Sequence, residues 1–252
     1  MKKNIGLERL ISKEVAIGTF LTIASPDLAE TVCDQDLDFV VLDWQHGEWT
    51  DGTASAALGR LINTKTAPLV RVRSHDPGLI NWVLDMGALG VVVPMVGDAL
   101  EAQAIVRTAF YPPRGYRSTG GNRLARMAGG DMSSYVAEAN DQILVVAMVE
   151  TKAAIHNVEE IMAVDGIGAV LIGPGDLMID VKSRGEGEEV HEALVQEVVS
   201  ASAKTGISAG IVVPNADLAR ERISQGFRFA LIGSERSVVS HAIRSLTEAV
   251  RG

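Results

Sequence analysis

The chain has 252 residues, 47% of them hydrophobic, and carries a formal net charge of −9. This hydrophobic fraction supports a sizeable core and excludes a disordered protein, while the acidic balance argues against nucleic-acid or anionic-membrane surfaces, which need basic patches. The single cysteine, Cys33, excludes an internal disulfide, the N-terminal MKKNIGLERLISKE is no secretory signal, and no run is long enough to cross a bilayer. We therefore expect a cytoplasmic protein.

Short apolar segments recur along the chain, and their near-continuous apolarity is typical of parallel strands covered on both faces. In chain order they are residues 16–22, 38–43, 67–72, 88–94, 143–150, 168–173, 207–213 and 227–233. Segments of helical period lie between them, from PDLAETVC to SERSVVSHAIRSLTEAV, and Gly87, Gly206 and Gly226 stand where helices are expected to end.

About eight strand–helix units predict a (β/α)₈ barrel, an α/β fold that forms a single domain over residues 1–252. The competing fold is a doubly wound open sheet, which usually shows a glycine-rich dinucleotide turn after its first strand. The first strand here is followed by TIASPDL instead. The long connection at 111–135 is the main irregularity, and long loops in compact domains tend to be functional.

Two acids follow adjacent predicted strands, Glu150 after the fifth and Asp176 after the sixth. The carboxyl ends of barrel strands meet at one face, so these side chains are expected to converge. Two carboxylates without a neighbouring histidine or cysteine suit a hard divalent cation that keeps several waters. Each acid may equally cap the helix that follows it, because helix starts favour acids.

Three more polar residues lie at the second and third strand exits. If Asp43 accepts a hydrogen bond from one ring nitrogen of His46, the other nitrogen can act as a base, although a structural histidine is the alternative. Arg71 lies in an apolar strand and needs a negative partner, either a barrel carboxylate or a substrate oxyanion. The turn GPGD at 173–176 offers backbone N–H groups to an anion, or is an ordinary tight turn. No predicted strand holds a lysine, which argues against a Schiff-base aldolase.

The ordered motifs LDWQHG, PLVRV, LDMGALGVVVPMV, YPPRGYR, VETKAA, IGPGDL and the GIVVPN stretch resemble the HpcH/HpaI aldolase family from about Gly18 to the last helix. Its members are class II, metal-dependent pyruvate aldolases, including 4-hydroxy-2-oxoheptanedioate and 2-keto-3-deoxy-sugar-acid aldolases. The resemblance implies a barrel of the phosphoenolpyruvate/pyruvate type and a cofactor of Mg²⁺ or Mn²⁺, with Co²⁺ as a third candidate. It also implies a homo-oligomer, a hexamer built as a trimer of dimers, whose last helix packs on a partner subunit.

The same resemblance implies roles for individual residues. Glu150 and Asp176 match the metal ligands, and His46, hydrogen-bonded to Asp43, matches the catalytic histidine. Arg71 matches the arginine that steadies the enolate oxygen, and Asp85 matches an acid supplied by a neighbouring subunit or from behind the site. The residues implied to contact the substrate are Arg71, Met148, Gly173, Pro174, Gly175, Asp176 and Val213.

The chain departs from the family pattern at three positions, with Gln45 in place of glutamate, Met148 in place of glutamine and Gly175 in place of alanine. Because the implied catalytic residues remain, we predict a carbon–carbon lyase that interconverts 4-hydroxy-2-oxo acids with pyruvate, or hydroxypyruvate, and an aldehyde. The alternatives are a CoA-thioester lyase of the malyl- or citryl-CoA type, for which no basic cluster is evident, and a barrel that binds a ligand without turnover.

Overall fold

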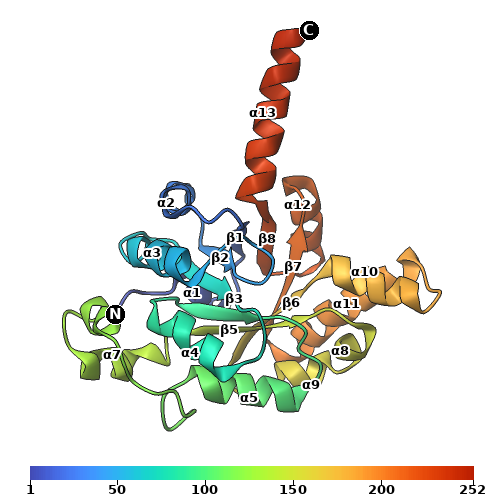
Figure 1. Cartoon of the computed structure of the whole chain (residues 1–252). Helices are drawn as coiled ribbons and strands as arrows, with labels where there is room; N and C mark the ends of the chain where they lie inside the picture. The colour runs from blue at the N-terminus through green and yellow to red at the C-terminus, as the bar shows by residue number, and fades with distance from the viewer.

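The computed structural model describes all 252 residues and confirms the predicted barrel, in which eight parallel strands close in sequence order (Figure 1). The first and last strands complete the ring, with Ala16 opposite Phe229. The strands are β1 (Ala16–Leu21), β2 (Phe39–Asp43), β3 (Ala67–Arg71), β4 (Gly90–Val93), β5 (Leu144–Val149), β6 (Ile167–Ile172), β7 (Ser208–Val213) and β8 (Phe229–Ser234).

Thirteen helices accompany the barrel. Those that follow β1 to β4 are α2 (Pro26–Cys33), α3 (Asp51–Leu61), α4 (Pro77–Asp85) and α5 (Ala99–Ala109). Those that follow β5 to β8 are α8 (Lys152–His156), α9 (Val158–Met162), α10 (Pro174–Ser183), α11 (Glu188–Thr205), α12 (Ala216–Gln225) and α13 (Glu235–Arg251). The remaining three are α1 (Ile5–Ile11), which precedes β1, and α6 (Asn122–Met127) and α7 (Met132–Ala139), which lie in and just beyond the long connection after α5. None of the helices combines the length and apolarity needed to cross a membrane.

Local chemistry fixes where these helices begin and end. Side chains at the first residue boundary accept an N–H of the first turn, as their short polar groups allow; they are Asn4, Ser25, Thr50, Asp76, Asp98, Asp131, Thr151, Asn215 and Ser234. Gly206 and Gly226 end α11 and α12 with φ of 76° and 119°, a conformation that glycine adopts without strain. Both glycine stops were predicted.

The core consists of two apolar layers, because successive side chains of a barrel strand point inward and outward in turn. The interior layer contains Phe39, Val41, Leu69, Val146 and Leu171, with Phe39 stacked on Phe229 at a centroid distance of 4.2 Å. The outward positions, Val40, Leu42, Val70, Val145 and Val170 among them, pack in the layer beneath the helices. This alternation decides which residues can reach the centre of the barrel mouth.

The last helix, α13, projects from the barrel instead of packing along it (Figure 1, red). Its apolar residues Val238, Ile243, Leu246 and Val250 are 59–87% exposed. Its first turn, in contrast, is fixed to the barrel. The buried Glu235 carboxylate accepts the N–H groups of Thr22, at 2.6 Å, and of Ile23, just after β1, and Arg236 pairs with Glu48 at 2.7 Å.

Candidate active site

Inward-facing positions place four predicted site residues at one barrel mouth. Counting in twos along the strands, Asp43 continues the inward series of β2, Arg71 that of β3, and Met148 and Glu150 that of β5. Strand pairing sets Asp43 opposite Arg71 and Met148 opposite Leu171. Asp43, Arg71 and Glu150 are all buried, at 3%, 7% and 3% exposure. Buried charges need partners, so the site is defined by how these three are paired.

Arg71 and Asp43 form a two-pronged ion pair. Arg71 Nε donates to Asp43 Oδ1 at 2.9 Å and Nη2 donates to Oδ2 at 2.7 Å. The guanidinium lies 4.5 Å from the centroid of the Phe20 ring, and Nη1 is 3.9 Å from the sulfur of Met148. Of the two readings left open for Arg71, the barrel carboxylate is therefore its partner, while Nη1 is the donor edge that remains for a substrate oxygen.

His46 lies at the mouth and is exposed. Its backbone N–H donates to Asp43 Oδ1 at 3.1 Å, and its ring makes no hydrogen bond. The expected bond between Asp43 and the ring is therefore absent, because both carboxylate oxygens are already occupied by Arg71 and one also by the His46 amide. Asp43 fixes the His46 backbone, helped by the N–H of Gly47, which donates to the Asp43 carbonyl at 2.9 Å.

Glu150 is oriented by one backbone amide. Its Oε2 accepts the N–H of Met95 at 2.8 Å, and Met95 has a left-handed φ of 55°, which a non-glycine residue rarely adopts. Its other oxygen, Oε1, lies against Gly173, where a Cβ atom would stand only 2.5 Å away. Burial, and then the nearby Asp176 carboxylate, raise the pKa of Glu150 despite the Met95 hydrogen bond and Arg71, which lower it.

Asp176 approaches Glu150 from α10, where it is the third residue of the helix and is exposed. The predicted GPGD turn is thus the start of an unpredicted helix. Gly173, at the helix boundary, has no side chain to cap it, and no other side chain does so. The amides of the first turn therefore stay open to an anion, as such groups have no partner within a helix.

The paired acids are the metal-ligand candidates of the molecule, since no group of three or more histidines, cysteines, aspartates or glutamates is placed to hold an ion. Two protein ligands leave the other coordination positions to water and substrate, as Mg²⁺-type sites do.

The other predicted substrate contacts surround this pair. Met148 and Val213 are 2% and 1% exposed, and a Cβ at Gly173 would touch the Met148 methyl at 2.9 Å. Pro174 is half-buried, and a Cβ at Gly175 would meet nothing within 4 Å. Gln45, where relatives were expected to carry glutamate, is half-buried and its Oε1 has no hydrogen-bond partner.

Asp85 is not brought to this mouth. It is the last residue of α4, which begins near the β3 exit and runs back to the opposite end of the barrel, where β4 starts. Arg117, whose side chain is fully buried against the ring of Tyr111, donates to it at 3.0 Å. A helix after a barrel strand always returns in this way, so Asp85 can serve an active site only if that site belongs to another copy of the chain.

Two contributors to this mouth escaped the sequence analysis. The Met95 amide holds Glu150 through its backbone, so no side-chain chemistry marks it; the only signal is its place after Pro94 at a strand exit. Asp180 lies in α10, which was not predicted, and accepts the N–H of Lys152 at 2.8 Å.

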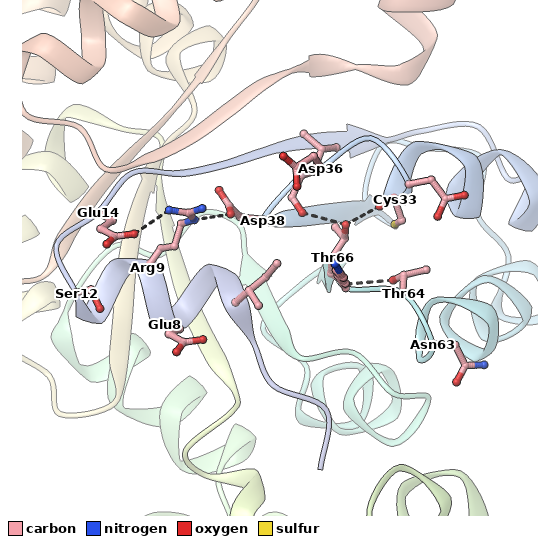
Figure 2. A pocket seen from close by; sticks show the side chains of 14 residues that line it. Glu8, Arg9, Ser12, Glu14, Cys33, Asp36, Asp38, Asn63, Thr64 and Thr66 are labelled. Carbon is pink, nitrogen blue, oxygen red and sulfur yellow. Dashed lines mark hydrogen bonds and ion pairs between the residues drawn. The ribbon is translucent and has the colours of Figure 1, made fainter.

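The largest cavity, about 710 Å³, lies at the opposite end of the barrel (Figure 2). It is lined by α1, by the 34–38 connection into β2 and by residues 63–66 before β3. Its polar groups satisfy one another: Arg9 pairs with Glu14 and Asp38, and the Thr66 hydroxyl contacts the carbonyls of Cys33 and Leu37. No predicted site residue lines it, and strand exits carry the chemistry of barrels, so this cavity is not the active site.

Comparison with known proteins agrees with the geometry. The model of the HpcH/HpaI aldolase/citrate lyase family matches residues 16–242. A 4-hydroxy-2-oxovalerate aldolase of Novosphingobium aromaticivorans is 38% identical over 87% of this chain and 84% of its own length. A hydroxypyruvate/pyruvate aldolase of Roseovarius nubinhibens is 33% identical over 93% of this chain and 92% of its own. The crystal structure of a HpcH/HpaI aldolase/citrate lyase family protein from Burkholderia cenocepacia superposes with a TM-score of 0.91, at 26% identity, over 99% and 100% of the two chains.

Proposed function

The chain belongs to the HpcH/HpaI aldolase/citrate lyase family, and on that premise we propose that it catalyses the reversible, metal-dependent cleavage of 4-hydroxy-2-oxo acids to pyruvate and an aldehyde. It is an aldolase, a carbon–carbon lyase with a pyruvate aldolase function. The observation that carries the metal-dependent mechanism is the pair of acids, Glu150 and Asp176, that face each other beside Arg71 at one mouth of the barrel. Hydroxypyruvate is a second candidate substrate, because relatives that accept it by name align over almost the whole chain.

The donor set fits a divalent cation such as Mg²⁺, Mn²⁺ or Co²⁺. Glu150 is buried beside another carboxylate, so its ionised form is disfavoured unless a positive charge lies between them. Glu150 and Asp176 would hold the ion, and water and substrate oxygens would complete its coordination. A bound cation supplies Lewis acidity that makes a methyl proton of pyruvate easier to remove.

The chain's own residues supply the other elements of the reaction. The open amides at the start of α10 suit the carboxylate of pyruvate. Arg71, locked in place by Asp43, presents Nη1 toward the developing negative charge on the enolate oxygen. His46, whose ring is free of intramolecular bonds, takes the methyl proton directly or through a water. The enolate carbon then attacks the aldehyde, and cleavage is the reverse.

A panel of 4-hydroxy-2-oxo acids, assayed with and without added Mg²⁺ or Mn²⁺, tests this function. We expect cleavage to pyruvate that a chelator abolishes and either ion restores. Covalent trapping of the enzyme by borohydride in the presence of pyruvate would contradict the metal mechanism. Turnover of a CoA thioester without cleavage of free oxo acids would favour the thioester lyase instead.

His46→Ala tests the proposed base separately. Exchange of the pyruvate methyl protons with solvent should slow by about 10²–10⁴-fold, the usual contribution of a general base. An unchanged exchange rate would remove His46 from the mechanism.

We also propose that the protein assembles, with α13 packing on a partner subunit as the family resemblance implies. Two features support this: the exposed apolar residues of α13, and the position of Asp85, which is useful only to another copy. A hexamer made of three dimers is the arrangement we expect.

A further inference from the structure

The two facing acids come from separate elements, so something must hold those elements at the right distance. Glu150 directly follows β5, whereas Asp176 lies on the first turn of α10. Strand pairing fixes the chain only as far as the strand ends, where Val149 lies opposite Ile172 and the N–H of Gly173 points to the Val149 carbonyl at 3.4 Å. Beyond Gly173 the helix leaves the sheet, and pairing no longer determines where Asp176 lies.

Asp180 joins the two elements directly. It lies one helical turn after Asp176, and its Oδ2 accepts the N–H of Lys152, two residues after Glu150, at 2.8 Å. Lys152 is the first residue of α8, so its N–H has no partner within that helix. The carboxylate therefore connects the helix of one metal-ligand candidate to the segment that carries the other.

Further contacts hold Asp180 and α10 in place. On the solvent side, Arg184 donates to the two oxygens of Asp180, at 3.3 Å from Nε and 3.1 Å from Nη2. The Asp180 side chain is 19% exposed. Just past the end of α10, Lys152 Nζ donates to Glu186 at 2.6 Å, which makes a second link between the same two segments.

From these contacts we propose that Asp180 is a positioning residue that sets the separation of Glu150 and Asp176, and thereby the affinity of the site for a divalent cation. The inference rests on the metal site proposed above. Loss of a residue that orients a metal ligand typically weakens metal binding by about 10–100-fold. If Asp180 served only to cap α8, its removal would lower stability and leave the metal affinity of the folded protein unchanged.

Titration of the purified chain with Mn²⁺ in a calorimeter, without substrate, tests this independently of turnover. Asp180→Ala should raise the Mn²⁺ dissociation constant by about tenfold or more. In Asp180→Asn the side-chain oxygen can still accept the Lys152 N–H, so the dissociation constant should rise by no more than about threefold. Thermal unfolding of each variant in EDTA verifies that it is folded.

Arg184→Ala is the matched control, because it removes the ion pair and leaves the bond from Asp180 to Lys152 intact. We expect some loss of stability and a dissociation constant within about twofold of the wild type. If Asp180→Ala does not fold, Asp180→Glu replaces it: the charge and the Arg184 pair persist, but one added methylene displaces the link, and affinity should fall several-fold.

A folded Asp180→Ala protein, or Asp180→Glu in its place, that binds Mn²⁺ within about twofold of the wild type would overturn the role of Asp180. A wild-type chain that binds no Mn²⁺ would instead overturn the metal site on which this inference rests.

Discussion

Gly173 is the residue at which a single methyl group would reach the paired acids. An added Cβ would stand 2.5 Å from Glu150 Oε1 and 2.9 Å from the Met148 methyl, and the φ of −92° imposes no strain of its own. Gly173→Ala should therefore displace the Glu150 carboxylate, weaken Mn²⁺ binding by at least about tenfold and cost about 1–3 kcal/mol of stability. Calorimetric titration and thermal unfolding measure the two effects.

Gly175→Ala is the control for this substitution. Nothing lies within 4 Å of the methyl group it adds, so both the metal affinity and the stability should stay near wild-type values. Equal effects of the two substitutions would show that space at Gly173 does not matter to the site.

The raised pKa of Glu150 gives the metal site a defined pH dependence. Because burial and Asp176 hold this pKa above the ordinary value of 4.5, the metal-free protein is most stable when Glu150 is protonated and loses stability as the pH rises through the folded pKa. A cation binds the ionised form and reverses this loss. The increase in unfolding temperature caused by Mn²⁺ should be small at about pH 5 and grow toward about pH 7.5.

Glu150→Gln provides the comparison for the pH measurement. The amide does not titrate and binds cations poorly, so the Mn²⁺ effect should be lost at every pH. A wild-type Mn²⁺ effect that is independent of pH would contradict the assignment of Glu150 as a ligand that must lose its proton.

At this scale the sequence indicated which residues meet but not how they bond. The inward alternation of strand residues was enough to bring Asp43, Arg71 and Glu150 to one mouth. The choice between partners for Asp43 depended on tertiary distances, and the pairing with Arg71 prevailed over the His46 ring. The Met95 amide was invisible in the sequence because any residue supplies an N–H group.

Among the helices and strands, the strand positions were predictable because buried parallel strands are short, apolar and regularly spaced. Errors were confined to short helices. The segment 152–163, expected as one helix, divides at Asn157 into α8 and α9, and part of the expected loop 111–135 is helical as α6 and the start of α7. One or two helical turns carry too little periodic signal to be distinguished from a loop, and α10 was missed because its Gly-Pro-Gly start is typical of a turn.

The apolar stripe of α13 leads to a prediction about assembly. Val239, Ile243, Leu246 and Val250 recur at helical spacing and are exposed in the single chain. If they pack on a partner, Leu246→Glu buries a charge in that interface and should raise the subunit dissociation constant by at least about tenfold, equivalent to 1.4 kcal/mol. Analytical ultracentrifugation measures the assembly state.

Ser245→Glu introduces the same charge on another side of α13 and should leave the assembly intact. A Leu246→Glu protein that sediments like the wild type would exclude the α13 stripe from the subunit interface.

For the molecule as a whole, the distance between Asp85 and the mouth predicts complementation between subunits. His46→Ala and Asp85→Ala should each be nearly inactive. In mixed assemblies, an Asp85→Ala subunit keeps His46 and can receive Asp85 from a His46→Ala neighbour. Random assembly in equal amounts gives roughly one functional site in four, and activity should return on mixing after reversible dissociation.

Activity of the Asp85→Ala protein at the wild-type level would show that Asp85 is not needed in either subunit. Mixed assemblies that remain inactive, although both parents assemble, would contradict its action across the interface.

The anchoring of α13 by Glu235 has a physiological consequence. The helix begins between the loops that follow β1 and β2, and the second of these loops carries His46. One end of α13 would thus sense whether a neighbour is present while the other steadies the proton acceptor. An enzyme built in this way should lose specific activity on dilution well before its circular dichroism reports unfolding, so that the cell's supply of the protein sets the rate per molecule as well as the total.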